Sequence, residues 1–235
     1  MSNSYFKFKN FTIEQNDCAM KVGTDGCLLG GWFNCEKSKR ILDIGCGTGV
    51  IAIMAAQRSD ACITGIEIDS KAARQARANA DNSPWGERIE ITNTDFLEYT
   101  THECFDTIVS NPPYFVNSLK CEDTSRTLAR HSGSLDCRSF FGKCSGILSK
   151  DGRISIVIPC DIMQEWIGAA AECNLYPTRT TSIKTTPKKA PKRVMIEFGF
   201  TRPDEIEEEV LILETTPGEY SEDARRILGE FYLKL

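Results

Sequence analysis

Apolar runs rich in β-branched residues alternate with helical patterns through the middle of the chain. The pattern predicts strands at 40–45, 62–68, 89–94, 105–110 and 153–158, and helices at 50–58, 70–81, 136–148 and 161–173. Two further β-rich runs, 176–186 and 193–201, flank a polar loop and predict a hairpin. This alternation is typical of a mostly parallel sheet with helices on both faces, which binds its ligand at the carboxyl ends of the strands.

The segments outside this alternation predict additions to one core. We expect a single domain over 1–235, made of an N-terminal segment that caps a small-molecule or substrate site (1–35), a core (36–201) and a C-terminal strand and helix (202–235). The polar stretch 116–135 is long for a structureless loop, which favours a functional role. Residues 209–214 are strand-like, and a helix is expected to begin at Ser221.

A glycine-rich turn follows the first core strand, in the run Leu42-Asp43-Ile44-Gly45-Cys46-Gly47-Thr48-Gly49. Glycines allow a close approach of ligand to backbone, and the helix that follows offers free N–H groups at its start. A dinucleotide site would need a glycine at position 50, which is Val50. The spacing therefore argues against a dehydrogenase.

Acidic residues end the next two strands. Glu67 lies about 20 residues after the last glycine, at the position where an acidic residue binds ribose hydroxyls in such folds. Asp95 and Phe96 pair an acceptor with an aromatic ring, which suits the exocyclic amine and the face of an adenine. The alternative for each carboxylate is a helix cap or a turn acid.

The tetrapeptide Asn111-Pro112-Pro113-Tyr114 directly follows the strand at 105–110. The Asn111 side-chain oxygen and the Pro112 carbonyl would accept both N–H bonds of a planar amine and aim its lone pair at an electrophile. Prolines fix the backbone that carries that carbonyl, and Tyr114 would stack on the planar group. The alternative is a plain turn at the end of a strand.

Together these motifs resemble the class I S-adenosylmethionine-dependent methyltransferases over roughly residues 15–200. The resemblance implies a Rossmann-like α/β fold, with a mostly parallel seven-stranded sheet and a C-terminal antiparallel hairpin, and S-adenosylmethionine as cofactor. It implies that the cofactor is bound by Thr24, Asp25, Asp43, Gly45, Cys46, Gly47, Gly49, Glu67, Ile68, Asp95, Phe96 and Asn111, with Asp43 near its methionine part. The assignment of Thr24 and Asp25 to the cofactor rests on analogy alone. The alternative is that these two residues begin a helix.

The flanks resemble the bacterial tRNA1(Val) adenine-37 N6-methyltransferases. The similar segments are Phe8–Phe11 with Lys21–Asp25, the pair Arg130-His131, and Phe231-Tyr232-Leu233. Release-factor glutamine methyltransferases share the tetrapeptide, but they carry a helical domain for which the residues before Arg40 are too few. The resemblance favours adenine in tRNA. A protein glutamine, adenine in ribosomal RNA or DNA, and a non-catalytic cofactor- or RNA-binding protein remain alternatives.

The distribution of charge indicates how this protein could bind nucleic acid. The net charge of −5 argues against a protein that coats nucleic acid, but five cations lie within residues 184–193. We expect RNA to be contacted by Arg126, Arg130, His131, Lys188, Lys189, Lys192 and Arg193. The alternatives are a solvated hairpin and arginines paired with Glu122 or Asp123.

The eleven cysteines form no C-x-x-C pair, and with only two histidines we expect neither disulfides nor a metal site. Cys46, Cys62 and Cys160 are expected to be small core residues. With no apolar run long enough for a leader or a membrane span, we expect a cytoplasmic monomer or weak dimer.

Overall fold

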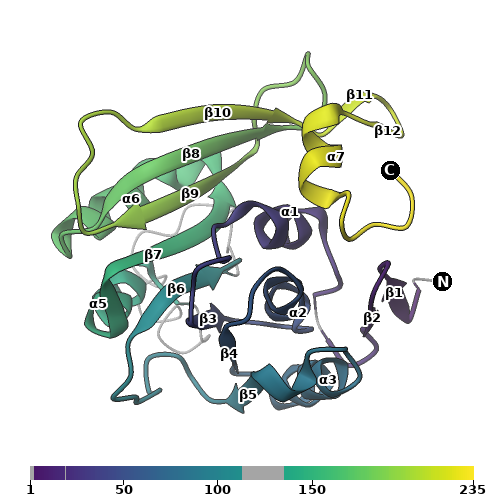
Figure 1. Cartoon of the computed structure of the whole chain (residues 1–235). Coiled ribbons are helices and arrows are strands. Elements are labelled where there is room, and N and C mark those ends of the chain that lie inside the picture. The colour runs from purple at the N-terminus through teal and green to yellow at the C-terminus, as the bar shows by residue number, and fades with distance from the viewer. Residues whose placement is uncertain (1–2, 19, 113–134) are drawn as a thin grey trace, which may run out of the picture.

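A computed structural model describes residues 3–18, 20–112 and 135–235. Its centre is an eight-stranded sheet in the order β10-β8-β9-β7-β6-β3-β4-β5 (Figure 1). The strands are β3 (Arg40–Ile44), β4 (Cys62–Glu67), β5 (Ile89–Asn93), β6 (Phe105–Ser110), β7 (Leu148–Pro159), β8 (Tyr176–Lys184), β9 (Arg193–Gly199) and β10 (Glu207–Ile212). Strands β3 to β7 pair in parallel, whereas β9 is antiparallel to both β7 and β8.

The predicted α/β class, with a mostly parallel sheet and a late antiparallel hairpin, is confirmed. The sheet has one strand more than the expected seven, because β10 adds to its edge in parallel with β8. That pairing lets Leu211 bury its side chain in the core. A short antiparallel hairpin of β1 (Tyr5–Lys7) and β2 (Thr12–Glu14) was not predicted, and neither was the pair β11 (Glu214–Thr216) and β12 (Glu219–Tyr220).

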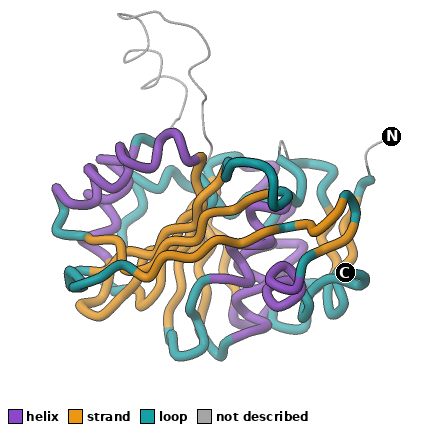
Figure 2. Tube along the Cα trace, turned by 90° about the horizontal axis from the view of Figure 1, so that it is seen from above, coloured by secondary structure: helices purple, strands orange, loops and turns teal. Residues whose placement is uncertain are grey.

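Helices cover both faces of the sheet, and Figure 2 shows the strands running between them. They are α1 (Thr24–Trp32), α2 (Val50–Arg58), α3 (Ser70–Asp81), α5 (Cys137–Ile147), α6 (Met163–Glu172) and α7 (Glu222–Leu228), with short 3-10 turns η1 (Gly86–Arg88) and η2 (Cys160–Ile162). Helices α1, α2 and α3 bury their apolar residues in one cluster, and α5 and α6 bury theirs in another. Helix α7 packs on α1 at the end of the chain (Figure 1).

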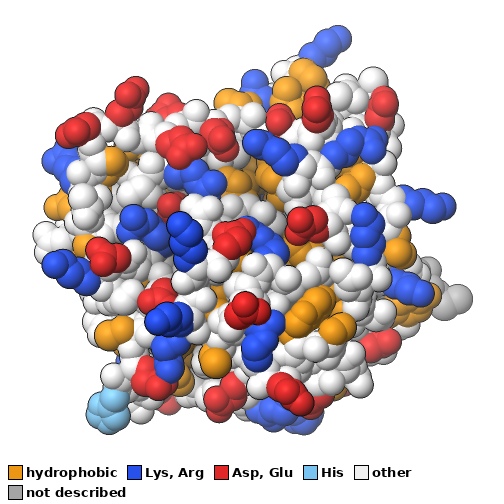
Figure 3. Space-filling model, viewed as in Figure 1, with side chains coloured by type: hydrophobic (Ala, Val, Ile, Leu, Met, Phe, Trp, Pro, Cys, Tyr) orange, Lys and Arg blue, Asp and Glu red, His pale blue; other side chains and the backbone are white. Residues whose placement is uncertain are grey.

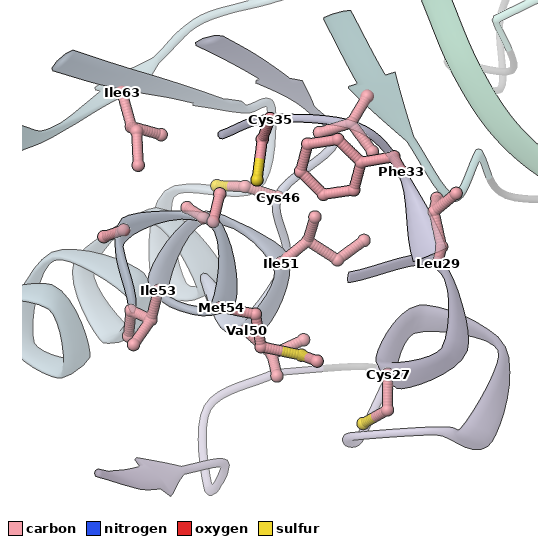
Figure 4. Packing of buried hydrophobic residues seen from close by; sticks show 14 of the residues in the cluster. Cys27, Leu29, Phe33, Cys35, Cys46, Val50, Ile51, Ile53, Met54 and Ile63 are labelled. Atoms are coloured by element: carbon pink, nitrogen blue, oxygen red, sulfur yellow. The ribbon is translucent and has the colours of Figure 1, made fainter. Parts of the chain in front are cut away.

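The cysteines divide into core and surface residues. Figure 4 shows Cys27, Cys35 and Cys46 among the apolar side chains between the sheet, α1 and α2, and all three are buried. The expectation for Cys62 was wrong, because it opens β4 at the amino end of the strand and is exposed. Cys160 is only half-buried, since it follows β7 where the strand leaves the sheet.

The carboxyl ends of β3, β4, β5, β6 and β7 meet at one edge of the sheet. The hairpin between β8 and β9 reaches the same edge, because Arg193 pairs in register with Pro159, the last residue of β7. The predicted hairpin is therefore confirmed, and its basic loop lies at the edge where the parallel strands end. In the described part of the chain, no helix has the length and apolarity needed to cross a bilayer.

Candidate active site

A cavity of about 280 Å³ opens at this edge of the sheet. Its walls come from the β3–α2 turn, the ends of β4, β5 and β6, and the segment before and inside the first turn of α1. Of the residues expected to bind cofactor, it is lined by Gly45, Cys46, Gly47, Glu67, Ile68, Asp95, Phe96 and Asn111. Chain folding therefore brings into one cavity residues that span more than sixty positions of sequence.

The glycine turn has the backbone that its sequence predicts. Gly45, Gly47 and Gly49 have φ values of 69°, 54° and 80°, which are costly for other residues. A Cβ at Gly45 or Gly47 would meet nothing within 4 Å, so both leave room in the cavity. Gly49 is different: it is buried, does not line the cavity, and a Cβ there would lie 3.4 Å from Ala76 of α3. Glycine is favoured there by its left-handed backbone at the start of α2 rather than by contact with a ligand.

Glu67 is fixed by two main-chain bonds. Its Oε2 accepts from the Gly47 N–H and its Oε1 from the Asp69 N–H, each at 2.9 Å. The carboxylate thus joins the glycine turn to the end of β4 while it lines the cavity. Each carboxylate oxygen has a second lone pair for a ligand hydroxyl.

Asp43 lies beneath the turn and outside the cavity lining. It is fully buried; Oδ2 accepts from the Ala52 N–H at 3.1 Å, and Oδ1 is buried with no hydrogen-bond partner. Burial, helped by the nearby negative charge of Glu67, raises the pKa of this carboxyl to about 7, although the hydrogen bond from the Ala52 N–H acts in the opposite direction. A buried carboxylate oxygen without a hydrogen-bond partner disfavours the charged form of the group.

At the end of β5, Asp95 is part of a turn. Its Oδ1 accepts from the Leu97 N–H at 2.8 Å, so the alternative reading as a turn acid is correct for one oxygen. Asp95 still lines the cavity, as does Phe96. The Phe96 ring is mostly buried and packs on Phe140 of α5, at 6.1 Å between centroids.

Asn111 follows β6 and faces the first turn of α1. A Cβ built on Gly26 would lie 3.6 Å from Asn111 Nδ2, so α1 forms the wall beside this amide. Pro112 is buried directly after it. The other residues expected here, Pro113, Tyr114, Arg126, Arg130 and His131, lie outside the described residues.

The residues expected to bind the cofactor at the start of α1, and one expected to bind RNA, have other surroundings in the structure. Thr24 and Asp25 begin α1 and do not line the cavity, and Asp25 Oδ2 accepts from Arg193 Nε at 2.9 Å. Arg193, expected to contact RNA, therefore has a protein partner. Lys188, Lys189 and Lys192 are exposed on the β8–β9 hairpin.

One wall of the cavity comes from the segment 1–35 that was expected to cap the cofactor or substrate, but its residues were not among the predicted site residues; they are Cys18, Met20, Lys21, Val22, Gly23 and Gly26. The available signal was the run of small residues around Gly23 and Gly26 ahead of an apolar helix. Among the described residues, no group of three or more histidine, cysteine or acidic side chains is arranged to hold a metal ion.

The residues present fit S-adenosylmethionine. The open space at Gly45 and Gly47 accommodates a ligand against the backbone, and Glu67 offers oxygens to a diol. Asp95 and Ile68 line the same cavity.

Solved structures show the same fold. A predicted O-methyltransferase from Agrobacterium tumefaciens matches with a TM-score of 0.68 at 20% identity, covering 90% of this chain and 99% of that one. A putative RNA methyltransferase from Pyrococcus horikoshii matches with a TM-score of 0.52 at 18% identity, covering 76% of this chain and 82% of that one.

Sequence comparison gives the family. Residues 19–164 match the methyltransferase small domain. A Bacteroides thetaiotaomicron protein named tRNA1(Val) (adenine(37)-N6)-methyltransferase is 47% identical over the whole of both chains, and one of the same name from Aeromonas hydrophila is 40% identical over 99% of each. The chain therefore belongs to the methyltransferase small-domain family and shares its full length with that family's tRNA1(Val) (adenine(37)-N6)-methyltransferases.

Proposed function

We propose that this protein transfers a methyl group from S-adenosylmethionine to the N6 amine of adenine 37 in tRNA1(Val). The observation that carries the proposal is the position of Asn111, which lines the same cavity as the glycine turn and Glu67. An amide acceptor beside a cofactor-sized cavity is suited to a planar amine. Full-length identity of 47% to a relative named for this reaction supports the substrate.

When bound, the cofactor supplies the electrophilic methyl group that the N6 lone pair attacks, and the products are N6-methyladenine, S-adenosylhomocysteine and a proton. The chain's own part is positional. Asn111 Oδ1 and the Pro112 carbonyl accept the two N6 hydrogens, which orients the lone pair and increases its electron density. Such orientation supplies up to about 7–11 kcal/mol in the best intramolecular cases. Water takes the proton afterwards, so no strong base is required.

The RNA partner would approach over the β8–β9 hairpin. Figure 3 shows cationic and anionic side chains interspersed over one face of the molecule, which gives no broad positive field there. The exposed Lys188, Lys189 and Lys192 form a local cluster at the edge of the sheet that also carries the cavity. A flipped adenine 37 would then reach Asn111 while the hairpin binds phosphates.

The decisive experiment is methyl transfer from labelled S-adenosylmethionine into total unmodified tRNA, followed by nucleoside analysis. We expect N6-methyladenosine at one position of a single tRNA species. No incorporation by protein that binds the cofactor would contradict the tRNA assignment. Methylated glutamine in a protein substrate would move the reaction to the alternative that the sequence left open.

A further inference from the structure

The β8–β9 hairpin, which carries the exposed lysines, is hydrogen-bonded to the edge of the sheet that carries the cavity. The Lys192 N–H donates to the Ile183 carbonyl, and the Lys192 carbonyl accepts from the Cys160 N–H, each at 3.2 Å. Arg193 begins β9 and pairs with both β7 and β8. The backbone of residues 192–193 therefore moves with the end of β7, and the exposed lysines beyond it are attached to a rigid base.

The Arg193 side chain leaves this base and reaches the first turn of α1. Its Nε donates to Asp25 Oδ2 at 2.9 Å, and the side chains are 35% and 33% exposed. An ion pair so exposed adds little to the stability of a fold. Its effect is geometric, because it joins two elements that are 168 positions apart in sequence.

The same turn of α1 forms the wall beside Asn111. Gly26, the next residue after Asp25, packs so that a Cβ would lie 3.6 Å from Asn111 Nδ2. Gly26 and Gly23 also line the cavity, whereas Asp25 does not. A shift of this turn would therefore move the wall that lies beside the Asn111 amide.

We propose that Asp25 and Arg193 are a positioning pair, which holds the first turn of α1, and with it Asn111, in register with the hairpin that binds RNA. This inference rests on the proposed function. It assigns Asp25 to the orientation of the amine rather than to the cofactor, and Arg193 to protein contact rather than to phosphate.

A double-mutant cycle on the full chain tests the pair. Asp25→Ala and Arg193→Ala should each lower kcat for tRNA by about ten- to a hundredfold, the range expected for a misplaced reacting group. The double variant should be no slower than the slower single variant, because both remove one contact. The Kd of S-adenosylmethionine, measured by calorimetry, should be unchanged in all three, and so should the salt dependence of tRNA binding.

Contrary results are equally clear. The proposed pair would be refuted if the losses of kcat multiply in the double variant, or if Asp25→Ala weakens cofactor binding. It would also be refuted if Arg193→Ala reduces the slope of log tRNA affinity against log salt by about one. Arg226→Ala is the matched control, since it removes an exposed arginine–aspartate pair on α7 and should leave kcat unchanged. If an alanine variant melts early, Asp25→Asn and Arg193→Gln repeat the cycle with side-chain size preserved. Failure of the wild-type protein to methylate tRNA would instead refute the proposed function.

Discussion

The Nδ2 of Asn79 donates a hydrogen bond of 2.9 Å to the main-chain carbonyl of Thr48, and so ties helix α3 to the glycine turn. The same nitrogen donates to the Glu14 carbonyl, and Oδ1 accepts from the Glu14 N–H, both at 2.9 Å. The next residue, Gln15, accepts from the Val22 N–H. Two buried amides thus connect the glycine turn with the opposite wall of the cavity.

Asn79→Ala should weaken cofactor binding more than it slows the reaction at saturating cofactor. Three main-chain groups would lose their partner, and the Thr48 carbonyl would be left unsatisfied in a buried site, which costs about 1–3 kcal/mol of unfolding free energy. Calorimetry with S-adenosylmethionine and denaturant titration measure the two effects. An unchanged Kd would refute the connection. Asn82→Ala, an exposed change at the end of the same helix, is the control.

Asn111→Ala should lower kcat by about a hundredfold or more, because the amine loses the acceptor that orients it. Binding of S-adenosylmethionine should stay near the wild-type value, since the glycine turn and Glu67 hold the cofactor by contacts of their own. Asn111→Asp keeps an oxygen acceptor and should retain part of the activity. Parallel losses of binding and turnover in the alanine variant would make the residue structural.

The space between Gly26 and Asn111 allows a graded test. An alanine Cβ at Gly26 would meet Asn111, Ile51 and Val50 at 3.6–4.0 Å, which is ordinary contact, so Gly26→Ala should remain active. The extra methyl groups of Gly26→Val would press on the Asn111 amide and should lower kcat strongly. The control is Gly142→Val, also in a helix but with nothing within 4 Å of the added Cβ. Full activity of Gly26→Val would show that Asn111 tolerates displacement.

The buried Asp43 should make stability depend on pH. Its pKa of about 7 lies above the ordinary value of 3.8, so the folded state keeps this proton up to a higher pH than the unfolded state. The unfolding free energy should therefore fall as the pH rises from about 4 to 7, and should then level off. Asp43→Asn removes the titrating group and should flatten this part of the curve, measured by denaturant titration at several pH values. An equal slope in both proteins would contradict the prediction.

Neutralising the hairpin lysines should weaken RNA binding in a salt-dependent way. In the triple variant Lys188→Ala, Lys189→Ala, Lys192→Ala, the slope of log affinity against log salt should fall by about two, because fewer counterions are released. Lys37→Ala with Lys39→Ala changes exposed cations before β3, away from the cavity edge, and should preserve the slope. If both variants behave alike, RNA binds elsewhere.

Local sequence patterns predicted the helices and strands whose formation depends on neighbouring residues. Runs rich in β-branched residues predicted β4 and β6 almost to the residue, and the alanine-rich repeat predicted the bounds of α3. Glycine spacing and the convergence of parallel strand ends located eight of the residues that line the cavity. These features depend on residues close in sequence, or on a rule that holds for every parallel sheet.

What the sequence missed depends on distant partners. No local signal joins Asp25 to Arg193, or Asn79 to Glu14, because each contact forms only after the sheet is complete. The three-residue strands β1 and β2 are too short for periodicity to reveal. Strand β10 was expected as a separate strand, and only its register with β8 makes it part of the sheet.

The position of β10 also has a consequence for the behaviour of the protein at high concentration. An edge strand presents unpaired main-chain groups that invite strands from other molecules. Here the strand opens with three consecutive glutamates, Glu207 to Glu209, and Glu207 and Glu208 are exposed. Two molecules that met edge to edge would bring these carboxylates together, so the acids protect the sheet against polymerisation along its open side.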